Sequence, residues 1–190
     1  MSFIRSLLPS FINNNIMYYV GKTQCYIQQY CTSDYTPSKM TDRIYVGSLA
    51  DASHKGALKN TGITHVISVM NGVYELYPDD FVYKIIHIND DTWENIGKYF
   101  DDTTQYINNI LNENENNKIL IHCQKGVSRS ITLLMAYLLH EYNNKNTIPI
   151  ERTENIILEL LENVKNNRSV ALPNDGFFNE LKSYVYRLNT

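Results

Sequence analysis

The stretch that decides the local fold runs from residue 121 to residue 130 and reads Ile121-His122-Cys123-Gln124-Lys125-Gly126-Val127-Ser128-Arg129-Ser130. Residues 118–122 are a short, mostly apolar run typical of a buried strand, and residues 129–142 are long and apolar enough for a central buried helix. A strand, a six-residue loop and a helix therefore follow one another. The backbone amides of the loop can surround an anion at the N-terminus of the helix, where N–H groups have no helical partner.

Cys123 and Arg129 stand at the two ends of this loop, and their chemistry suits one phosphate group. A free thiol titrates at about 8.5, but a helix N-terminus and a nearby cation lower that pKa, so an attacking thiolate can exist at neutral pH. The Arg129 guanidinium can donate to two phosphate oxygens at once and can hold the charge that spreads over them in the transition state. Lysine is a point charge and cannot supply this fork.

The other residues of the stretch have supporting roles in this prediction. The Ser130 hydroxyl is placed to donate to the sulfur, which would help the thiolate to leave when a phosphorylated enzyme is hydrolysed. Gly126 lets the loop turn tightly, and His122 is expected behind the loop as a structural hydrogen-bonding group. The predicted phosphate-binding residues are Gln124, Lys125, Gly126, Val127, Ser128 and Arg129.

Two other interpretations compete with a catalytic loop. A lone cysteine is usually a small buried apolar residue, and a loop of this kind can bind phosphate without cleaving an ester. Catalysis is favoured by the combination of the flanking strand and helix with His122 before Cys123, Gly126 at the third loop position, and Arg129-Ser130 at the end.

The pattern His122-Cys123-x5-Arg129-Ser130 resembles the signature of the cysteine-dependent protein phosphatases, and its ending Gly-Val-Ser-Arg-Ser resembles their dual-specificity branch. The resemblance extends in order over about residues 40–188, with further similar stretches at 42–48, 62–69 and 173–177. It implies hydrolysis of phosphate esters on phosphotyrosine and on phosphoserine or phosphothreonine proteins, through a phosphocysteine intermediate and without a metal or cofactor. A phosphorylated protein would be the substrate.

This chemistry needs a general acid, which protonates the departing ester oxygen and later accepts a proton from the attacking water. Asp90 and Asp91 are the candidates, because they follow the predicted strand 82–88 in a loop that can reach over the site. In the dual-specificity pattern the acid precedes the threonine of an Asp-Thr pair, which here is Asp91-Thr92. The role is therefore predicted for Asp91, with Asp90 as the alternative, although either carboxylate could simply cap the following helix.

Two other classes of function remain open. The same chemistry serves phosphoinositide and RNA 5′-triphosphate phosphatases, whose loops resemble His-Cys-x5-Arg-Thr, often with several lysines in the lipid enzymes. Ser130 and the single loop lysine, Lys125, argue against both. A phosphopeptide-binding module that does not hydrolyse its ligand would have no need of Cys123, Asp91 and Arg129 together.

Strands and helices alternate along the chain. Strands are expected at 42–48, 64–69, 82–88 and 118–122, and helices at 50–60, from about 96, at 129–142, from Pro149, and after Asn174 as N-cap. This order predicts an α/β fold with a central, mostly parallel sheet flanked by helices and the active-site loop between a strand and a helix N-terminus. A catalytic domain at 40–190 follows an N-terminal arm at 1–39.

Composition fits one enzyme domain in a reducing compartment. The chain has 190 residues, 43% of them hydrophobic, and a net charge of −3 without basic clusters, so nucleic-acid binding is not expected. Cys25, Cys31 and Cys123 do not form a disulfide framework, and the nucleophile must stay reduced, which indicates the cytoplasm. Asparagine-rich runs suggest an AT-rich genome, such as that of a large DNA virus, an amoeba or an apicomplexan. Residues 85–102 resemble poxvirus dual-specificity phosphatases, which favours a viral source, with the host cytoplasm or the virion as location.

The N-terminal arm carries an amphipathic stripe formed by Phe3, Ile4, Leu7, Leu8, Phe11 and Ile12. Pro9 and an asparagine triplet interrupt it, so no membrane span is expected, since a span takes about 20 apolar residues. Three partners are open for this stripe: the chain's own domain, a membrane surface, or a second copy of the chain in a homodimer.

Exchange of the arm between two subunits predicts a homodimer for the full chain and a monomer for a chain that starts at Met40. Light scattering of both proteins at matched concentrations measures this difference. A monomer in both cases would exclude exchange and leave the other two partners.

Overall fold

The computed structural model describes residues 37–190, so nearly all of the arm predicted at 1–39, with Cys25 and Cys31, lies outside the described residues. In this part of the chain one sheet has the strand order β1-β2-β5-β3-β4. The strands are β1 Ser38–Lys39, β2 Ile44–Gly47, β3 His65–Val69, β4 Val82–Ile86 and β5 Ile119–His122. The helices are α2 Leu49–Ser53, α3 Lys55–Thr61, α4 Phe100–Glu113, α5 Arg129–Lys145, α6 Thr153–Asn167 and α7 Asp175–Leu188, with 3-10 turns η1 Gly97–Tyr99 and η2 Ile150–Arg152.

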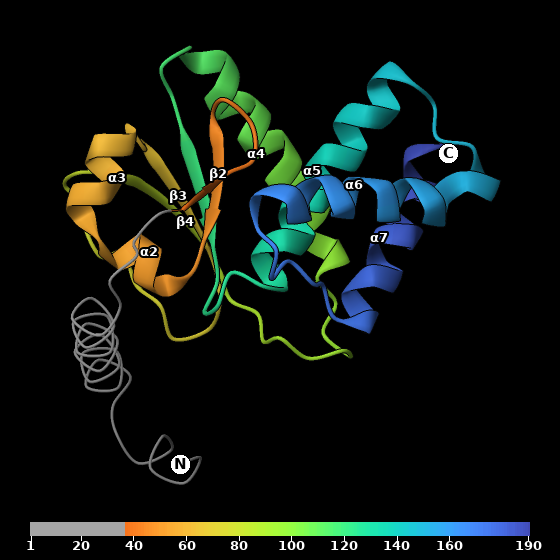
Figure 1. The fold of residues 1–190 in the computed structure, drawn as a ribbon, viewed down its shortest axis with the longest axis horizontal. Coiled ribbons are helices and arrows are strands. Elements are labelled where there is room, and N and C mark those ends of the chain that lie inside the picture. The colour runs from red at the N-terminus through yellow and green to blue at the C-terminus, as the bar shows by residue number, and fades with distance from the viewer. Residues whose placement is uncertain (1–36) are drawn as a thin grey trace, which may run out of the picture.

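The sheet is covered on both faces (Figure 1). Helices α2 and α3 lie on one side, and α4 to α7 form a thicker layer on the other. Side chains alternate along β5: Ile119 and Ile121 belong to the larger core with α4 to α7, whereas Leu120 belongs to the smaller core with α2 and α3. Because both faces are buried, the central strands β2, β5 and β3 are mostly apolar and fully buried.

The direction of the strands brings the predicted loop to one edge of the sheet. Strands β2, β5, β3 and β4 are parallel, and β1 runs antiparallel to β2. The prediction of an α/β fold with a mostly parallel sheet is therefore confirmed. Gly47 of β2 and Ser68 of β3 both pair with His122, the last residue of β5. The chain after His122 thus emerges between two strand ends, at the carboxyl edge where open α/β sheets hold their ligands.

The long helices follow the predicted apolar pattern. Helix α5 contacts α4, α6 and α7 and is the central helix of its layer. Helix α4 turns Phe100, Ile107 and Ile110 into the core. Asn174 caps α7 as predicted, because its Oδ1 accepts a hydrogen bond from the Phe177 amide at 2.9 Å.

Four elements differ in detail from the sequence prediction. The helix expected over 50–60 is two short helices, because His54 (φ −94°, ψ 80°) leaves the helical region and accepts from the Ala57 amide through Nδ1 at 2.9 Å. Helix α6 begins at Thr153, after the turn η2, rather than at Pro149. Strand β4 ends at Ile86, two residues before the predicted end, and the two-residue strand β1 was not predicted.

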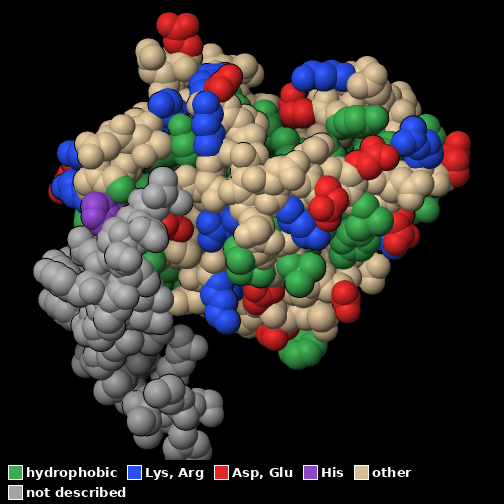
Figure 2. Space-filling model, viewed as in Figure 1, with side chains coloured by type: hydrophobic (Ala, Val, Ile, Leu, Met, Phe, Trp, Pro, Cys, Tyr) green, Lys and Arg blue, Asp and Glu red, His purple; other side chains and the backbone are tan. Residues whose placement is uncertain are grey.

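Charged side chains of both signs are interspersed on the face shown in Figure 2. Charged side chains also pair across helices, as Lys182 Nζ of α7 does with Glu154 Oε2 of α6 at 2.7 Å. This face therefore presents no large field of one sign. Within residues 37–190, none of the helices combines the length and apolar character that crossing a membrane requires.

Candidate active site

The loop that joins β5 to α5 is packed closely against the end of β2. Gly126 has a φ of 67°, in the left-handed region that favours glycine. A Cβ at this position would lie 2.5 Å from the carbonyl oxygen of Gly47. A side chain at position 126 would therefore displace the loop from the strand.

Cys123 follows β5 directly and is only 1% exposed. Its Sγ accepts hydrogen bonds from the Gly126 amide at 3.2 Å and from the Ser130 hydroxyl at 3.3 Å. Burial alone would raise the pKa of the Cys123 thiol, but hydrogen bonds from Ser130 and the Val127 amide, together with the charge of Arg129, lower that pKa below its ordinary value. The surroundings of the sulfur therefore favour the thiolate.

His122 lies behind the loop and is buried. Its Nε2 lies 2.8 Å from the Ser68 hydroxyl, and its Nδ1 lies 3.4 Å from the Cys123 carbonyl oxygen. Because a carbonyl oxygen can only accept, Nδ1 carries the proton and Nε2 accepts from Ser68. Burial lowers the pKa of His122 to about 4, so the imidazole is a neutral link between β3 and the loop at physiological pH.

Arg129 begins α5, and its side chain reaches the segment after β4. Its Nη1 donates to the Ile88 carbonyl oxygen at 3.1 Å, and its Nε lies 3.6 Å from Asp90 Oδ2. Nη2 has no hydrogen-bond partner among the described residues and is available to an oxyanion. The structure thus places a cation beside the loop, between Cys123 and the predicted acid segment.

Of the two aspartates considered as the acid, the structure places Asp90 against the loop. Asp90 Oδ1 accepts from the Ser128 hydroxyl at 2.6 Å and from Asn174 Nδ2 at 2.9 Å. The side chain of Asp91 makes no hydrogen bond or ion pair within residues 37–190, and only its carbonyl oxygen accepts, from the Glu94 amide at 3.1 Å. These contacts favour Asp90, the alternative, over Asp91, the residue predicted first.

Comparison with known proteins assigns this arrangement to a family. The dual specificity phosphatase catalytic domain matches residues 44–187. The chain belongs to the dual specificity phosphatase family. Dual specificity protein phosphatase 1 of Arabidopsis thaliana is 34% identical over 149 residues, which are 78% of this chain and 69% of that protein. Protein phosphatase Slingshot of Drosophila melanogaster is 33% identical over 148 residues, which are 78% of this chain but only 13% of that protein.

Solved structures show the same fold. The Yvh1 phosphatase domain from Chaetomium thermophilum matches with a TM-score of 0.69 and 26% identity, over 80% of this chain and 95% of that chain. OH1 from the Orf virus matches with a TM-score of 0.67 and 22% identity, over 88% of this chain and 99% of that chain, a likeness of fold alone. The resemblance predicted from the sequence is confirmed at the level of the family, and the viral source stays a prediction.

In this dual specificity phosphatase the N-terminus of α7 contacts both Asp90 and the loop between β5 and α5. The Asn174 side chain donates to Asp90, and the Asn174 amide donates to Ser128 Oγ at 3.2 Å. A Cβ at Gly176 would overlap the Thr92 carbonyl oxygen, so the backbone at Thr92, two residues after Asp90, is in close contact with the first turn of α7. The sequence predicted Asn174 only as a helix cap, because its contact with Asp90 joins residues 84 positions apart.

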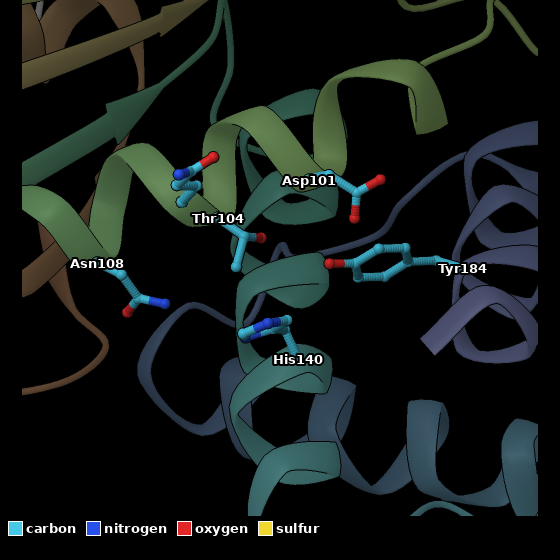
Figure 3. A pocket seen from close by; sticks show the side chains of 6 residues that line it. Asp101, Thr104, Asn108, His140 and Tyr184 are labelled. Atoms are coloured by element: carbon cyan, nitrogen blue, oxygen red, sulfur yellow. The ribbon is translucent and has the colours of Figure 1, made fainter. Parts of the chain in front are cut away.

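A separate hollow of the phosphatase, with a volume of about 310 Å³, lies between α4, α5 and α7 (Figure 3). It is lined by Asp101, Thr104, Gln105, Asn108, His140 and Tyr184. These residues include no cysteine or arginine, so phosphate-ester chemistry is assigned to the loop and not to this hollow. Within residues 37–190, no group of three or more His, Cys, Asp and Glu side chains is arranged to hold a metal ion.

The buried histidine behind the loop predicts a pH dependence of folding stability. Above its ordinary pKa of 6.5, His122 is neutral in both the folded and the unfolded chain. Between pH 6.5 and about 4 the unfolded chain binds a proton that the folded chain excludes, so the free energy of unfolding should fall by up to ~3 kcal/mol over that range. Denaturant unfolding at several pH values measures this change.

His122→Gln keeps a polar partner for Ser68 but does not titrate, so this variant should lose less stability than the wild type between pH 6.5 and 4. His87→Gln, the same change at an exposed histidine, is the matched control. If the free energy of unfolding changes with pH in parallel for the wild type and His122→Gln, the pH dependence does not come from His122.

Proposed function

We propose that this phosphatase hydrolyses phosphate monoesters on phosphotyrosine and on phosphoserine or phosphothreonine proteins through a phosphocysteine intermediate and without a metal. The observation that carries the proposal is the Cys123 sulfur, which receives hydrogen bonds from Gly126 and Ser130 beside the guanidinium of Arg129. Loop amides and Arg129 supply the preorganised positive field that the transferred phosphoryl group needs. A reducing compartment such as the cytoplasm is part of the proposal, because only the reduced thiolate attacks.

In the first step the Cys123 thiolate attacks phosphorus, a P–S bond forms and the P–O bond to the substrate side chain breaks. Arg129 donates to two phosphate oxygens, on which negative charge is spread. Protonated Asp90 gives its proton to the departing oxygen. The dephosphorylated side chain therefore leaves as a neutral hydroxyl group.

In the second step water attacks the phosphorus of the phosphocysteine. The Asp90 carboxylate, left by the first step, takes a proton from this water. The P–S bond breaks, inorganic phosphate forms and the sulfur returns to the thiolate. The Ser130 hydroxyl, 3.3 Å from Sγ, stabilises the departing sulfur.

We assign the acid to Asp90 rather than Asp91, which reverses the order taken from the sequence. Ser128 and Asn174 hold Oδ1 of Asp90, and its Oδ2 lies 3.6 Å from Nε of the phosphate-binding Arg129. A carboxyl group fixed in this way stays close to where the ester oxygen departs. No such contact fixes the Asp91 side chain within the described residues.

Cys123→Ser removes the nucleophile and keeps the loop, so turnover should be lost while phosphopeptide binding persists. Mass spectrometry of acid-quenched reactions should find a phosphate on Cys123 of the wild type.

Ser130→Ala tests the second step: the sulfur leaves less easily, so the phosphorylated enzyme should accumulate and kcat should fall. A chelator should leave wild-type turnover unchanged. Absence of any phosphorylated cysteine during wild-type turnover would contradict the proposal.

Asp90→Asn keeps one acceptor oxygen for Ser128 and Asn174 but has no acidic proton to give, so kcat for a phosphotyrosine peptide should fall by about 10²–10⁴-fold. Asp91→Asn, the matched neighbour, should stay within a few-fold of the wild type. The loss in Asp90→Asn should shrink as the leaving phenol of an aryl phosphate becomes more acidic, because such a group needs less protonation. A large loss in Asp91→Asn with normal activity in Asp90→Asn would return the role to Asp91.

A further inference from the structure

The phosphate loop has a rear face, formed by the carbonyl groups that point away from the site. The Leu49 amide donates to the carbonyl oxygen of Gln124 at 3.3 Å, and the Leu172 amide donates to that of Val127 at 2.8 Å. The amide and hydroxyl of Thr132 donate to the carbonyl oxygen of Ser128 at 2.8 Å and 2.9 Å. Three backbone amides and the Thr132 hydroxyl therefore satisfy the carbonyl groups at both ends of this rear face.

The two carbonyl groups in the middle of the rear face are satisfied by one side chain. Arg168, which follows α6, donates through Nε to the carbonyl oxygen of Gly126 at 2.6 Å and through Nη2 to that of Lys125 at 3.1 Å. Its Nη1 donates to the Ser38 hydroxyl of β1 at 3.3 Å. Each nitrogen of the guanidinium thus has a partner, and two of the three partners belong to the loop.

Each of these carbonyl groups shares a planar peptide with an amide that points at the nucleophile. The carbonyl of Lys125 lies in the same peptide plane as the Gly126 N–H, which donates to Cys123 Sγ at 3.2 Å. The carbonyl of Gly126 lies in the same plane as the Val127 N–H, an amide that helps to lower the pKa of the Cys123 thiol. In a trans peptide the C=O and N–H groups point in opposite directions, so fixing the carbonyl outward fixes the amide inward.

We propose that Arg168 is a positioning residue of the phosphate loop: its guanidinium fixes two consecutive peptide planes so that their N–H groups point at the Cys123 sulfur. The proposal rests on the function proposed above and names a residue that acts through the loop without touching the substrate. The fork geometry is essential, because a lysine ammonium cannot hold two neighbouring carbonyl groups in fixed directions.

The local packing supports this role. A Cβ at Gly126 would overlap Nη2 of Arg168, so the loop lies directly against the guanidinium. The backbone of Arg168 is itself fixed, since its amide donates to Val164 of α6 at 2.9 Å and its carbonyl accepts from Ala171 at 2.9 Å. Leu172, which follows Ala171, donates through its amide to the Val127 carbonyl oxygen of the loop. Residues 168–172 therefore form one continuous support behind the loop.

Loss of the guanidinium should change the chemistry of the site as well as the stability of the fold. Without a donor behind it, a peptide of the loop can rotate so that its carbonyl turns inward and its amide turns away from the sulfur. An inward carbonyl repels both the thiolate and a phosphate anion. The Gly126 peptide should respond most, because Gly126 is buried, whereas water can reach exposed Lys125.

The test compares Arg168→Ala with the wild type in two measurements that need no turnover. Calorimetry gives the dissociation constant for inorganic phosphate, and the pH dependence of Cys123 alkylation by iodoacetate gives the midpoint at which the thiolate forms. In Arg168→Ala the dissociation constant for inorganic phosphate should rise about tenfold. The midpoint of Cys123 alkylation should move to higher pH. Arg168→Lys keeps the charge but not the fork, so it should show a smaller change in the same direction.

Arg43→Ala is the matched control. Arg43 also donates to backbone carbonyls, those of Leu111, Asn114 and Glu115 at 2.8, 3.2 and 3.4 Å, but at the end of α4 and before β2, away from the loop. This variant should lower the melting temperature and leave phosphate binding and the alkylation midpoint at wild-type values.

The proposal is overturned if Arg168→Ala resembles Arg43→Ala, with a lower melting temperature but unchanged phosphate affinity and alkylation. It is overturned equally if Arg168→Lys matches the wild type in both measurements. If Arg168→Ala does not fold, the comparison of Arg168→Lys with the wild type tests the proposal by itself. A wild-type chain that binds phosphate without hydrolysing esters would contradict the proposed function and still leave both measurements valid for Arg168.

Discussion

A planar peptide that turns its N–H toward an anion must turn its carbonyl toward the protein, and the phosphate loop can form only where those carbonyls find donors. Here the donors come from Leu49 of α2, from Thr132 of α5, and from Arg168 and Leu172 in the segment after α6. Elements far apart in the chain therefore converge on the rear of one short loop. The parallel sheet makes this possible by ending β2 and β3 on either side of β5.

The same constraint governs the ionisation of the nucleophile. Burial is the largest influence on the Cys123 thiol and acts to raise its pKa, so a buried sulfur without donors would stay protonated. The amides of the loop, the Ser130 hydroxyl and the charge of Arg129 together outweigh that burial. A buried site also keeps water away from these hydrogen bonds, which strengthens each of them. The burial that opposes the thiolate therefore also strengthens the donors that stabilise it.

The sequence predicted what is local or periodic. The strand, loop and helix around Cys123 follow from apolar runs and one glycine, and the cap at Asn174 follows from residue type. Contacts between distant segments have no such signal, which is why Arg168 was missed and why the choice between Asp90 and Asp91 rested on a pattern. Two adjacent residues in a loop look alike in sequence, and only the positions of Ser128 and Asn174 distinguish them. The break at His54 was missed for a related reason, since a histidine that caps a helix through its ring is not a common N-cap residue.

Arg129 links the proposed acid, Asp90, to the proposed phosphate site. In the structure it contacts the acid segment, through the Ile88 carbonyl and near Oδ2 of Asp90. A bound phosphate competes for this guanidinium, because a doubly charged group with several acceptors offers a better bidentate partner than one carboxylate oxygen at 3.6 Å. The contacts of Asp90 Oδ1 with Ser128 and Asn174 do not involve Arg129, so they would keep the proposed acid in place when a phosphate binds. Oδ2 would then be the free oxygen, and it lies on the side of Arg129, which is where we propose that the substrate ester binds. The substrate itself would therefore release the oxygen that carries the proton to the leaving group.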